Sequence, residues 1–135
     1  MAHYLLDTNH TSPLVTLDHP LRAKILARRE QGDIFSLCVP VVAETKFGIG
    51  VLPRAQYNLE EWQNLKLILD TYSLDEDDAE FAADLRLSLK KTGWQLALAD
   101  ALIAAVALRY DLILLTTDKD FRAVEGLQTE NWLVD

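Results

Sequence analysis

The chain of 135 residues carries a net charge of −8, and half of its residues are hydrophobic. This composition predicts one globular domain over residues 1–135 and excludes an intrinsically disordered chain. The acidic balance argues against a protein that holds nucleic acid on a broad basic face, but not against an enzyme that meets phosphate through bound cations.

The sequence has no run of about 18 apolar residues, the length that crosses a membrane, and no secretion signal at its start. Cys38 is the only cysteine, so neither an internal disulfide nor a thiolate cage for a metal is expected. These features predict a cytoplasmic protein with no membrane contact.

Short apolar runs alternate along the chain with helical patterns. In chain order, the predicted strands cover residues 4–6, 33–38, 71–74, 111–117 and 127–133. The predicted helices cover residues 18–32, 39–50, 56–71, 75–93 and 96–110, with shorter turns at 10–14 and 118–124. This alternation predicts a three-layer α/β/α fold around a central, mostly parallel sheet of four to five strands.

Four acids stand where the chain reaches one edge of the predicted sheet. Asp7 and Asp118 directly follow apolar strand segments, and Glu44 lies near the start of the helix after the second strand. Asp100 falls in the first turn of a helix that is otherwise apolar on every side. The carboxyl ends of parallel strands share one edge, so the four carboxylates are expected to meet there.

Each acid also has a purely structural interpretation. Asp7 fits a turn residue, Glu44 a solvated helix residue, and Asp118 or Asp120 a helix cap. Asp100 is the hardest to explain in this way, because an acid on an apolar helix is costly unless it is paired or liganded.

A cluster of ionised carboxylates has to be compensated. Two like charges ~4 Å apart repel by ~4 kcal/mol at an effective dielectric of ~20, so the cluster must take up protons or bind cations. Oxygen donors without thiolates or a histidine pair favour Mg²⁺ or Mn²⁺ over Zn²⁺. Such ions acidify a water and stabilise both oxygens of a phosphodiester exchange, which predicts metal-assisted hydrolysis with no protein nucleophile.

Other polar and aromatic residues give weaker signals. Arg86 and Lys90 share a helix face and could touch a phosphate backbone, although a solvated face is the preferred interpretation. Trp62, Trp94 and Trp132 are too scattered to predict a base-stacking platform. The three histidines lack ligand spacing and are expected to be structural or exposed.

At this point the chain resembles a known family, the PIN-domain ribonucleases, and within it the VapC-type toxins of bacterial toxin–antitoxin pairs. The matching segments, in order, are Leu6–Asn9, Ala43–Glu44 with Gly48, Asp100–Ala105, Thr116–Phe121, Val124–Leu127 and Trp132. The resemblance covers essentially the whole chain. It implies that Asp7, Glu44, Asp100 and Asp118 are catalytic metal ligands. It also implies support from Asn9 and Thr116, and Asp120 is a further candidate for positioning the substrate.

The resemblance implies an endoribonuclease acting on RNA, often transfer RNA, that forms a homodimer and is silenced by a cognate antitoxin. The segment Glu125–Trp132 is similar to members that cut initiator transfer RNA. Two departures concern the helix of Glu44. Val39 and Val41 replace the usual hydroxyl residues, which predicts a helix without a hydroxyl cap, and Thr45 replaces a usual Leu.

Three alternatives share some of these features. A haloacid dehalogenase-type phosphatase needs a second Asp where this chain has Asn9. A receiver domain needs paired acids near the first strand and a Lys where this chain has Thr116 and Thr117, although Lys119 is near. The third is a catalytically inactive PIN-like scaffold that binds a protein or RNA partner. The intact set of four acids argues against it.

Overall fold

A computed structural model describes residues 1–133 and contains one five-stranded sheet with the order β3-β2-β1-β4-β5. The strands are β1 (His3–Leu6), β2 (Ile34–Cys38), β3 (Asp70–Tyr72), β4 (Ile113–Leu115) and β5 (Thr129–Glu130). Every neighbouring pair runs parallel. The predicted central sheet is therefore confirmed.

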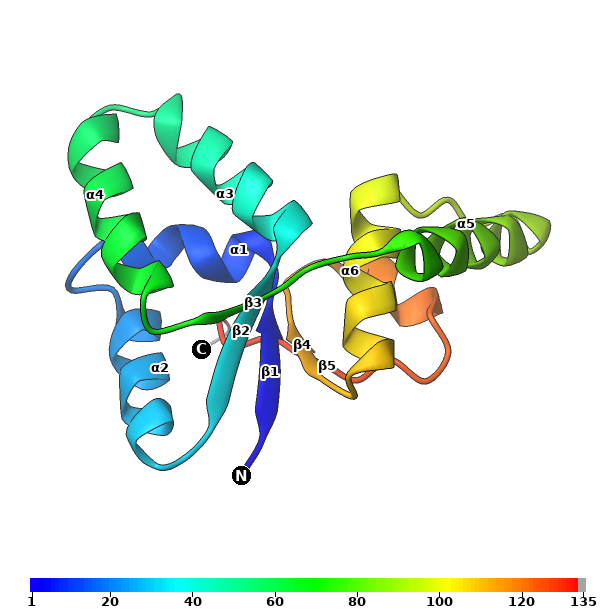
Figure 1. The fold of residues 1–135 in the computed structure, drawn as a ribbon, viewed down its shortest axis with the longest axis horizontal. Coiled ribbons are helices and arrows are strands. Elements are labelled where there is room, and N and C mark those ends of the chain that lie inside the picture. Colours follow the sequence, from blue (N-terminus) through cyan, green and yellow to red (C-terminus); the bar gives the residue numbers. More distant parts are fainter. Residues whose placement is uncertain (134–135) are drawn as a thin grey trace.

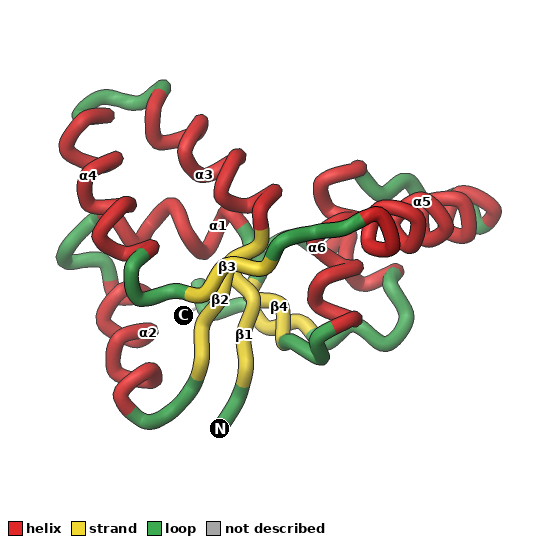
Figure 2. Tube along the Cα trace, in the orientation of Figure 1, coloured by secondary structure: helices red, strands yellow, loops and turns green. Residues whose placement is uncertain are grey.

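Helices cover both faces of this sheet. The α-helices are α1 (Thr8–Thr11), α2 (Pro20–Glu30), α3 (Val39–Gly50), α4 (Ala55–Lys66), α5 (Glu76–Lys91) and α6 (Leu98–Arg109). Two 3-10 helices are η1 (Ser12–Val15) and η2 (Lys119–Ala123). Figure 1 shows α1 to α4 on one side of the sheet and α5 and α6 on the other, which confirms the three layers. The chain crosses from one layer to the other in the connection between β3 and α5, drawn green in Figure 2.

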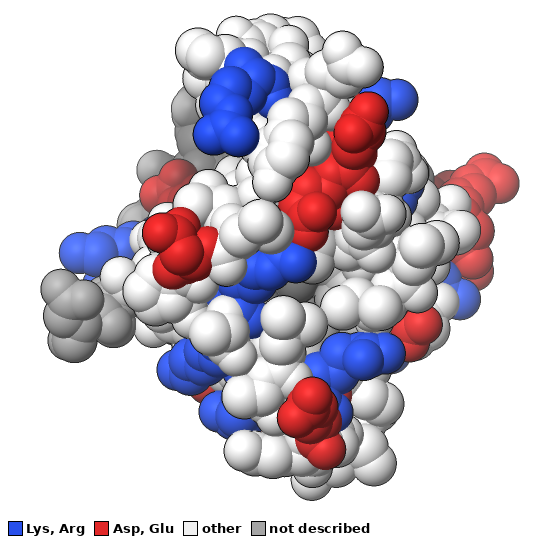
Figure 3. Space-filling model, turned by 90° about the vertical axis from the view of Figure 1, so that its left-hand side faces the viewer, with Lys and Arg blue, Asp and Glu red and all other residues white. Residues whose placement is uncertain are grey.

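The surface on the side of α1 to α4 mixes both signs of charge. In Figure 3, Lys and Arg form small patches that are separated by uncharged atoms and by patches of Asp and Glu. This face offers no broad basic surface, as the net charge of −8 led us to expect. Among the helices of residues 1–133, none is long and apolar enough to cross a membrane.

The predicted boundaries differ from the structure at two edges of the sheet. Helix α4 ends at Lys66 rather than near residue 71, because the backbone must leave the helix for β3 to pair with β2 from Asp70 onward. The last strand was expected over 127–133 but pairs only at Thr129–Glu130. Beyond it the chain turns inward, and the Trp132 ring packs edge-on at 4.9 Å from Tyr4.

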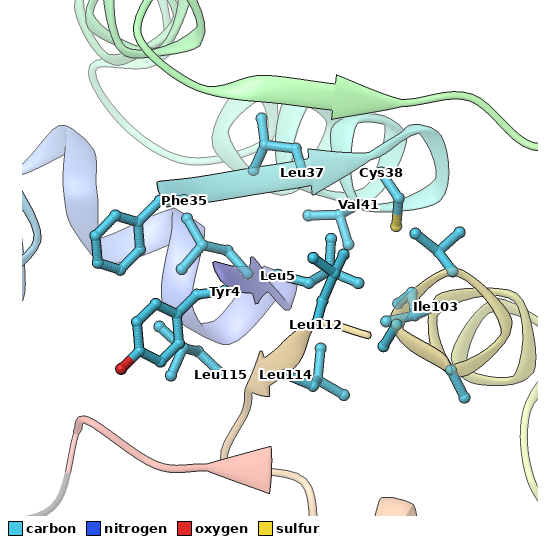
Figure 4. Close-up of a cluster of buried hydrophobic side chains, with 14 of the residues drawn as sticks. Tyr4, Leu5, Phe35, Leu37, Cys38, Val41, Ile103, Leu112, Leu114 and Leu115 are labelled. Atoms are coloured by element: carbon cyan, nitrogen blue, oxygen red, sulfur yellow. The ribbon is translucent and has the colours of Figure 1, made fainter. Parts of the chain in front are cut away.

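The three central strands β1, β2 and β4 are buried on both faces, which explains why they are mostly apolar without alternation, whereas the edge strands β3 and β5 are polar and largely exposed. Tyr4 and Phe35 are register partners of β1 and β2, and their rings stack 5.1 Å apart. Figure 4 shows this pair pointing away from Ile103 of α6, while the neighbouring Leu5 lies between the strands and that helix. Leu5 and Ile103 are fully buried, so the core extends through all three layers.

The long helix α5 begins with a capping box of two acids. The carboxylate of Asp75 accepts from the Asp78 backbone N–H at 3.0 Å, and Asp78 accepts from the Asp75 N–H at 2.9 Å. Asp78 also pairs with Arg109 of α6 at 2.9 Å and is only 3% exposed. It therefore joins α5 to α6 as well as capping a helix.

We expect Asp78→Ala to lower the free energy of unfolding by about 2 kcal/mol, because it removes one of the two hydrogen bonds of the capping box and one partner of Arg109. Urea denaturation followed by circular dichroism measures the change. Asp77→Ala, at an exposed neighbouring acid, is the matched control and should stay within about 0.5 kcal/mol of the wild type. Equal losses in both variants would contradict a special role for Asp78.

Candidate active site

Four acids from four separate elements lie at the carboxyl edge of the sheet. Asp7 follows β1 directly and caps α1, and Asp118 lies beyond β4 and caps η2. Glu44 is in the second turn of α3, which begins directly after β2, and Asp100 is in the first turn of α6. Because β1 lies between β2 and β4, the chain delivers them to one rim. We call these residues the acidic quartet.

The charges of the quartet act on one another. Burial, and then the negative charges of Asp7, Asp118 and Glu44, raise the pKa of Asp100 to about 6. Burial and the charge of Asp7 raise the pKa of Glu44. Burial also raises the pKa of Asp7, with a further contribution from Asp118. The repulsion expected from the sequence is thus present at this edge.

Asp7 is the most tightly held member of the quartet and is only 6% exposed. Its Oδ1 accepts from the backbone N–H of Thr8 at 2.8 Å. Its Oδ2 accepts from the hydroxyl of Thr116 at 2.7 Å and from the amide of Asn9 at 3.3 Å. Thr116 Oγ1 in turn accepts from the Asp118 backbone N–H at 3.0 Å. Asn9 and Thr116 therefore fix Asp7 and tie the end of β1 to the end of β4.

A second line of hydrogen bonds runs from Asn9 to the end of the chain. Asn9 Oδ1 accepts from the Thr117 backbone N–H at 3.2 Å and from His10 Nδ1 at 2.7 Å. His10 Nε2 accepts from the Trp132 backbone N–H at 3.1 Å. A backbone N–H can only donate, so His10 is neutral with its proton on Nδ1. Burial agrees with this assignment, since it lowers the pKa of His10 to about 4.

Sequence reasoning identified His10 only as structural or exposed and missed this connection. His10 and Trp132 lie 122 positions apart, so no local pattern relates them. The fold makes His10 fully buried and places it between Asn9 and the C-terminal segment.

Glu44 is exposed, and its helix is positioned by means other than a hydroxyl cap. No side chain caps the start of α3, as the valines at positions 39 and 41 led us to expect. Instead the buried hydroxyl of Thr45 lies 2.6 Å from the hydroxyl of Thr11. This bond joins α3 to the short helix that follows Asp7. Thr45, which stands where the resembled family usually has Leu, therefore helps to position α3 through this hydrogen bond.

Asp120 lies at the margin of the quartet. It is exposed, and its backbone N–H donates to Asp118 Oδ1 at 2.8 Å. Its negative charge is one of those that raise the pKa of Asp100. Asp120 therefore adds to the charge at the rim without a bond to Asp7 among the described residues.

The donor set fits a hard divalent cation by its chemistry. All four side chains offer carboxylate oxygens, and among residues 1–133 none of them pairs with a Lys, Arg or His. In the described part of the chain, however, no three Asp, Glu, His or Cys side chains are close enough to hold one ion as they stand. Binding would therefore require rotation of the less restrained carboxylates, above all the exposed Glu44.

Comparisons with known proteins identify the family to which this sequence is similar. The family model described as PIN domain matches residues 4–127. The chain is similar to ribonuclease VapC5 of Mycobacterium tuberculosis, with 30% identity over 96 residues that make up 70% of this chain and 71% of the relative.

Solved structures share the fold. One is VapBC2 of Rickettsia felis bound to a promoter DNA fragment, with a TM-score of 0.84 and 21% identity over 96% of this chain and 98% of that one. Another is VapBC-5 of M. tuberculosis, a member of the VapBC family of toxin–antitoxin systems. Its TM-score is 0.63, with 23% identity over 97% and 98% of the two chains.

We expect Asp100→Asn to stabilise the metal-free protein above about pH 6. Because the folded protein raises the pKa of Asp100 from 3.8 to about 6, the ionised carboxylate of this half-buried group costs on the order of 1–2 kcal/mol of stability at higher pH, once solvent screening is allowed for. This cost disappears below the unfolded pKa, where the group is protonated in both states. Urea titrations in EDTA at pH 4 and pH 8 measure the difference.

The matched control for this titration is Asp77→Asn, which removes an exposed acid at the start of α5. It should show little gain at either pH. A gain in Asp100→Asn that is equally large at pH 4 and pH 8 would rule out the ionised Asp100 carboxylate, whether disfavoured by burial or by its acidic neighbours, as its cause.

Proposed function

The chain belongs to the PIN-domain family, and we propose that it is a Mg²⁺- or Mn²⁺-dependent endoribonuclease, the toxin of a toxin–antitoxin pair. One observation carries this proposal: four acids from four elements lie at one sheet edge, and no described Lys, Arg or His pairs with them. The ribonuclease name of the curated relative supports the same class of reaction.

The proposed reaction is hydrolysis of an RNA phosphodiester. A water oxygen bonds to phosphorus while the bond to the leaving ribose oxygen breaks, and no protein side chain forms a covalent intermediate. A divalent cation held by Asp7, Glu44, Asp100 and Asp118 would acidify the water and stabilise charge on the phosphate. The hydrogen bonds of Asn9 and Thr116 orient Asp7 in advance, which reduces the cost of assembling the site.

The proposed partners follow from the same family membership. They are an RNA substrate, with transfer RNA as the first candidate, a cognate antitoxin protein and a second copy of this chain. Phe47, Val51 and Leu52 near the end of α3 are 73%, 64% and 60% exposed, and exposed apolar side chains of this kind suit a protein contact. The proposed place of action is the cytoplasm.

We expect the purified protein to cleave single-stranded RNA in Mn²⁺ and to lose this activity in EDTA. Asp7→Asn and Asp100→Asn should each lower the cleavage rate at least ~100-fold. Mutation of a residue that only hydrogen-bonds a metal ligand typically lowers activity ~10–100-fold, and loss of a ligand itself should cost more. Gel analysis of a labelled RNA measures the rate. Asp77→Asn removes an acid away from the rim and should cleave like the wild type.

The same assay tests the main alternative, a catalytically inactive scaffold. A scaffold would bind a partner but cleave no RNA with either cation. Cleavage that is equal in the wild type and both active-site variants would instead indicate a contaminating nuclease.

A second measurement tests metal binding without activity. At a free Mn²⁺ concentration ten times Kd, binding should add about 1.4 kcal/mol of stability, or roughly 5 °C in Tm. We expect less than half of this shift in Asp100→Asn, which has lost a ligand and the repulsion that the cation relieves. Differential scanning fluorimetry measures both. Equal shifts in the two proteins would argue against a cation at the quartet.

A further inference from the structure

A cleft beside the acidic quartet is not used by the chemistry described above. Its volume is about 730 Å³, within the range of ~300–1,000 Å³ typical of ligand sites. It lies between α5 and the loop that leads to α6, and Asp120 of η2 forms part of its border. Its lining includes Arg86, Leu87, Lys90, Trp94, Leu96 and Asp120.

The cleft and the quartet adjoin at two places. Asp120 borders the cleft, and its backbone N–H bonds the carboxylate of Asp118. Ala97 also lines the cleft and is the N-cap of α6, three positions before Asp100. A chain-like ligand that occupies the quartet can therefore continue into the cleft.

Two cations on α5 face this cleft. Arg86 and Lys90 are one helical turn apart, where like charges repel each other. Within residues 1–133 neither forms an ion pair, although Arg22, Arg28 and Arg109 all do. An anion in the cleft would relieve this repulsion.

Arg86 is held in place by the loop that it faces. Its Nε donates to the carbonyl oxygen of Leu96 at 2.9 Å. The guanidinium has five donors in a fixed fork, so its terminal nitrogens keep donors for an anion. This geometry suits a phosphate group.

The third feature of the cleft is an aromatic ring. Trp94 is 36% exposed and lines the same cleft as the two cations. Its backbone N–H bonds the Leu89 carbonyl oxygen at 3.0 Å, which fixes the start of the loop at the end of α5. Aromatic rings beside cations are the usual means of holding single-stranded nucleic acid, because bases stack on the ring and phosphates meet the charge.

We infer that the α5–α6 cleft, lined by Arg86, Lys90 and Trp94, binds the single-stranded RNA next to the cleaved bond. The two cations contact phosphate and Trp94 stacks on a base. This inference rests on the proposed nuclease function and identifies where its substrate lies. RNA fits this cleft better than an acidic peptide. The phosphates of an RNA strand whose cleaved bond lies at the quartet would extend along the strand into the cleft. The carboxylates of a peptide would instead approach the carboxylate of Asp120 with no cation between the two negative charges.

The test uses fluorescence anisotropy to measure the binding of a labelled 12-nucleotide single-stranded RNA to the Asp7→Asn protein. Lys90→Glu should weaken binding about 5- to 20-fold and reduce its salt dependence. Lys91→Glu is the matched control, since the adjacent exposed Lys91 is not among the cleft residues, and it should stay within about twofold. Trp94→Ala should weaken binding about 5- to 50-fold, and Trp94→Phe should restore most of it.

Cleavage by the otherwise wild-type protein provides the second readout. The cleft variants should raise KM more than they lower kcat, and circular dichroism should show an unchanged fold.

If Lys90→Glu and Lys91→Glu bind and cleave RNA alike, the cleft is not the RNA site, although the nuclease proposal stands. If Lys90→Glu keeps RNA binding but loses the antitoxin, the cleft is a protein contact and the inference is wrong. If the wild type neither binds nor cleaves RNA, both proposals fail.

Discussion

The parallel register of β1 with its two neighbours is the constraint on which the site depends. Leu6 at the end of β1 pairs with Leu115 at the end of β4, and the Asp7 backbone N–H continues the ladder to the Leu115 carbonyl oxygen at 3.0 Å. This register places the Asp7 carboxylate beside the Thr116 hydroxyl. A slip by one residue would turn the apolar side chains of β1 to the opposite faces and separate this pair, so core packing and site geometry are specified together.

The acidic quartet is costly, and the surrounding structure offsets the cost. Burial and mutual repulsion raise the pKa values of Asp7, Glu44 and Asp100. Asp7 is nevertheless kept in one orientation by donors from Thr8, Asn9 and Thr116. The network beyond it extends through His10 to Trp132, whose ring packs on Tyr4 of β1. The C-terminal segment thus supports the carboxylate that stands at the first strand's end.

The charge distribution assigns the two parts of the proposed function, cleavage and RNA binding, to two neighbouring regions. An acidic chain with a net charge of −8 gains little from long-range attraction to nucleic acid. Cations bound at the quartet would meet the cleaved phosphate, while Arg86 and Lys90 supply positive charge only in the adjoining cleft. Such a local arrangement would let a protein with an acidic surface bind the proposed RNA substrate.

The sequence by itself determined which segments become strands and helices, because apolar runs and cap residues act locally. It also located Asp7 and Asp118 at strand ends and Asp100 on a buried helix, since an acid beside apolar residues is conspicuous. It could not determine that β5 is two residues long, that His10 meets Trp132, or that Trp94 and Lys90 share a cleft with Asp120. Only the tertiary structure decided these points, because they depend on packing between segments far apart in the chain, and no local periodicity carries that information.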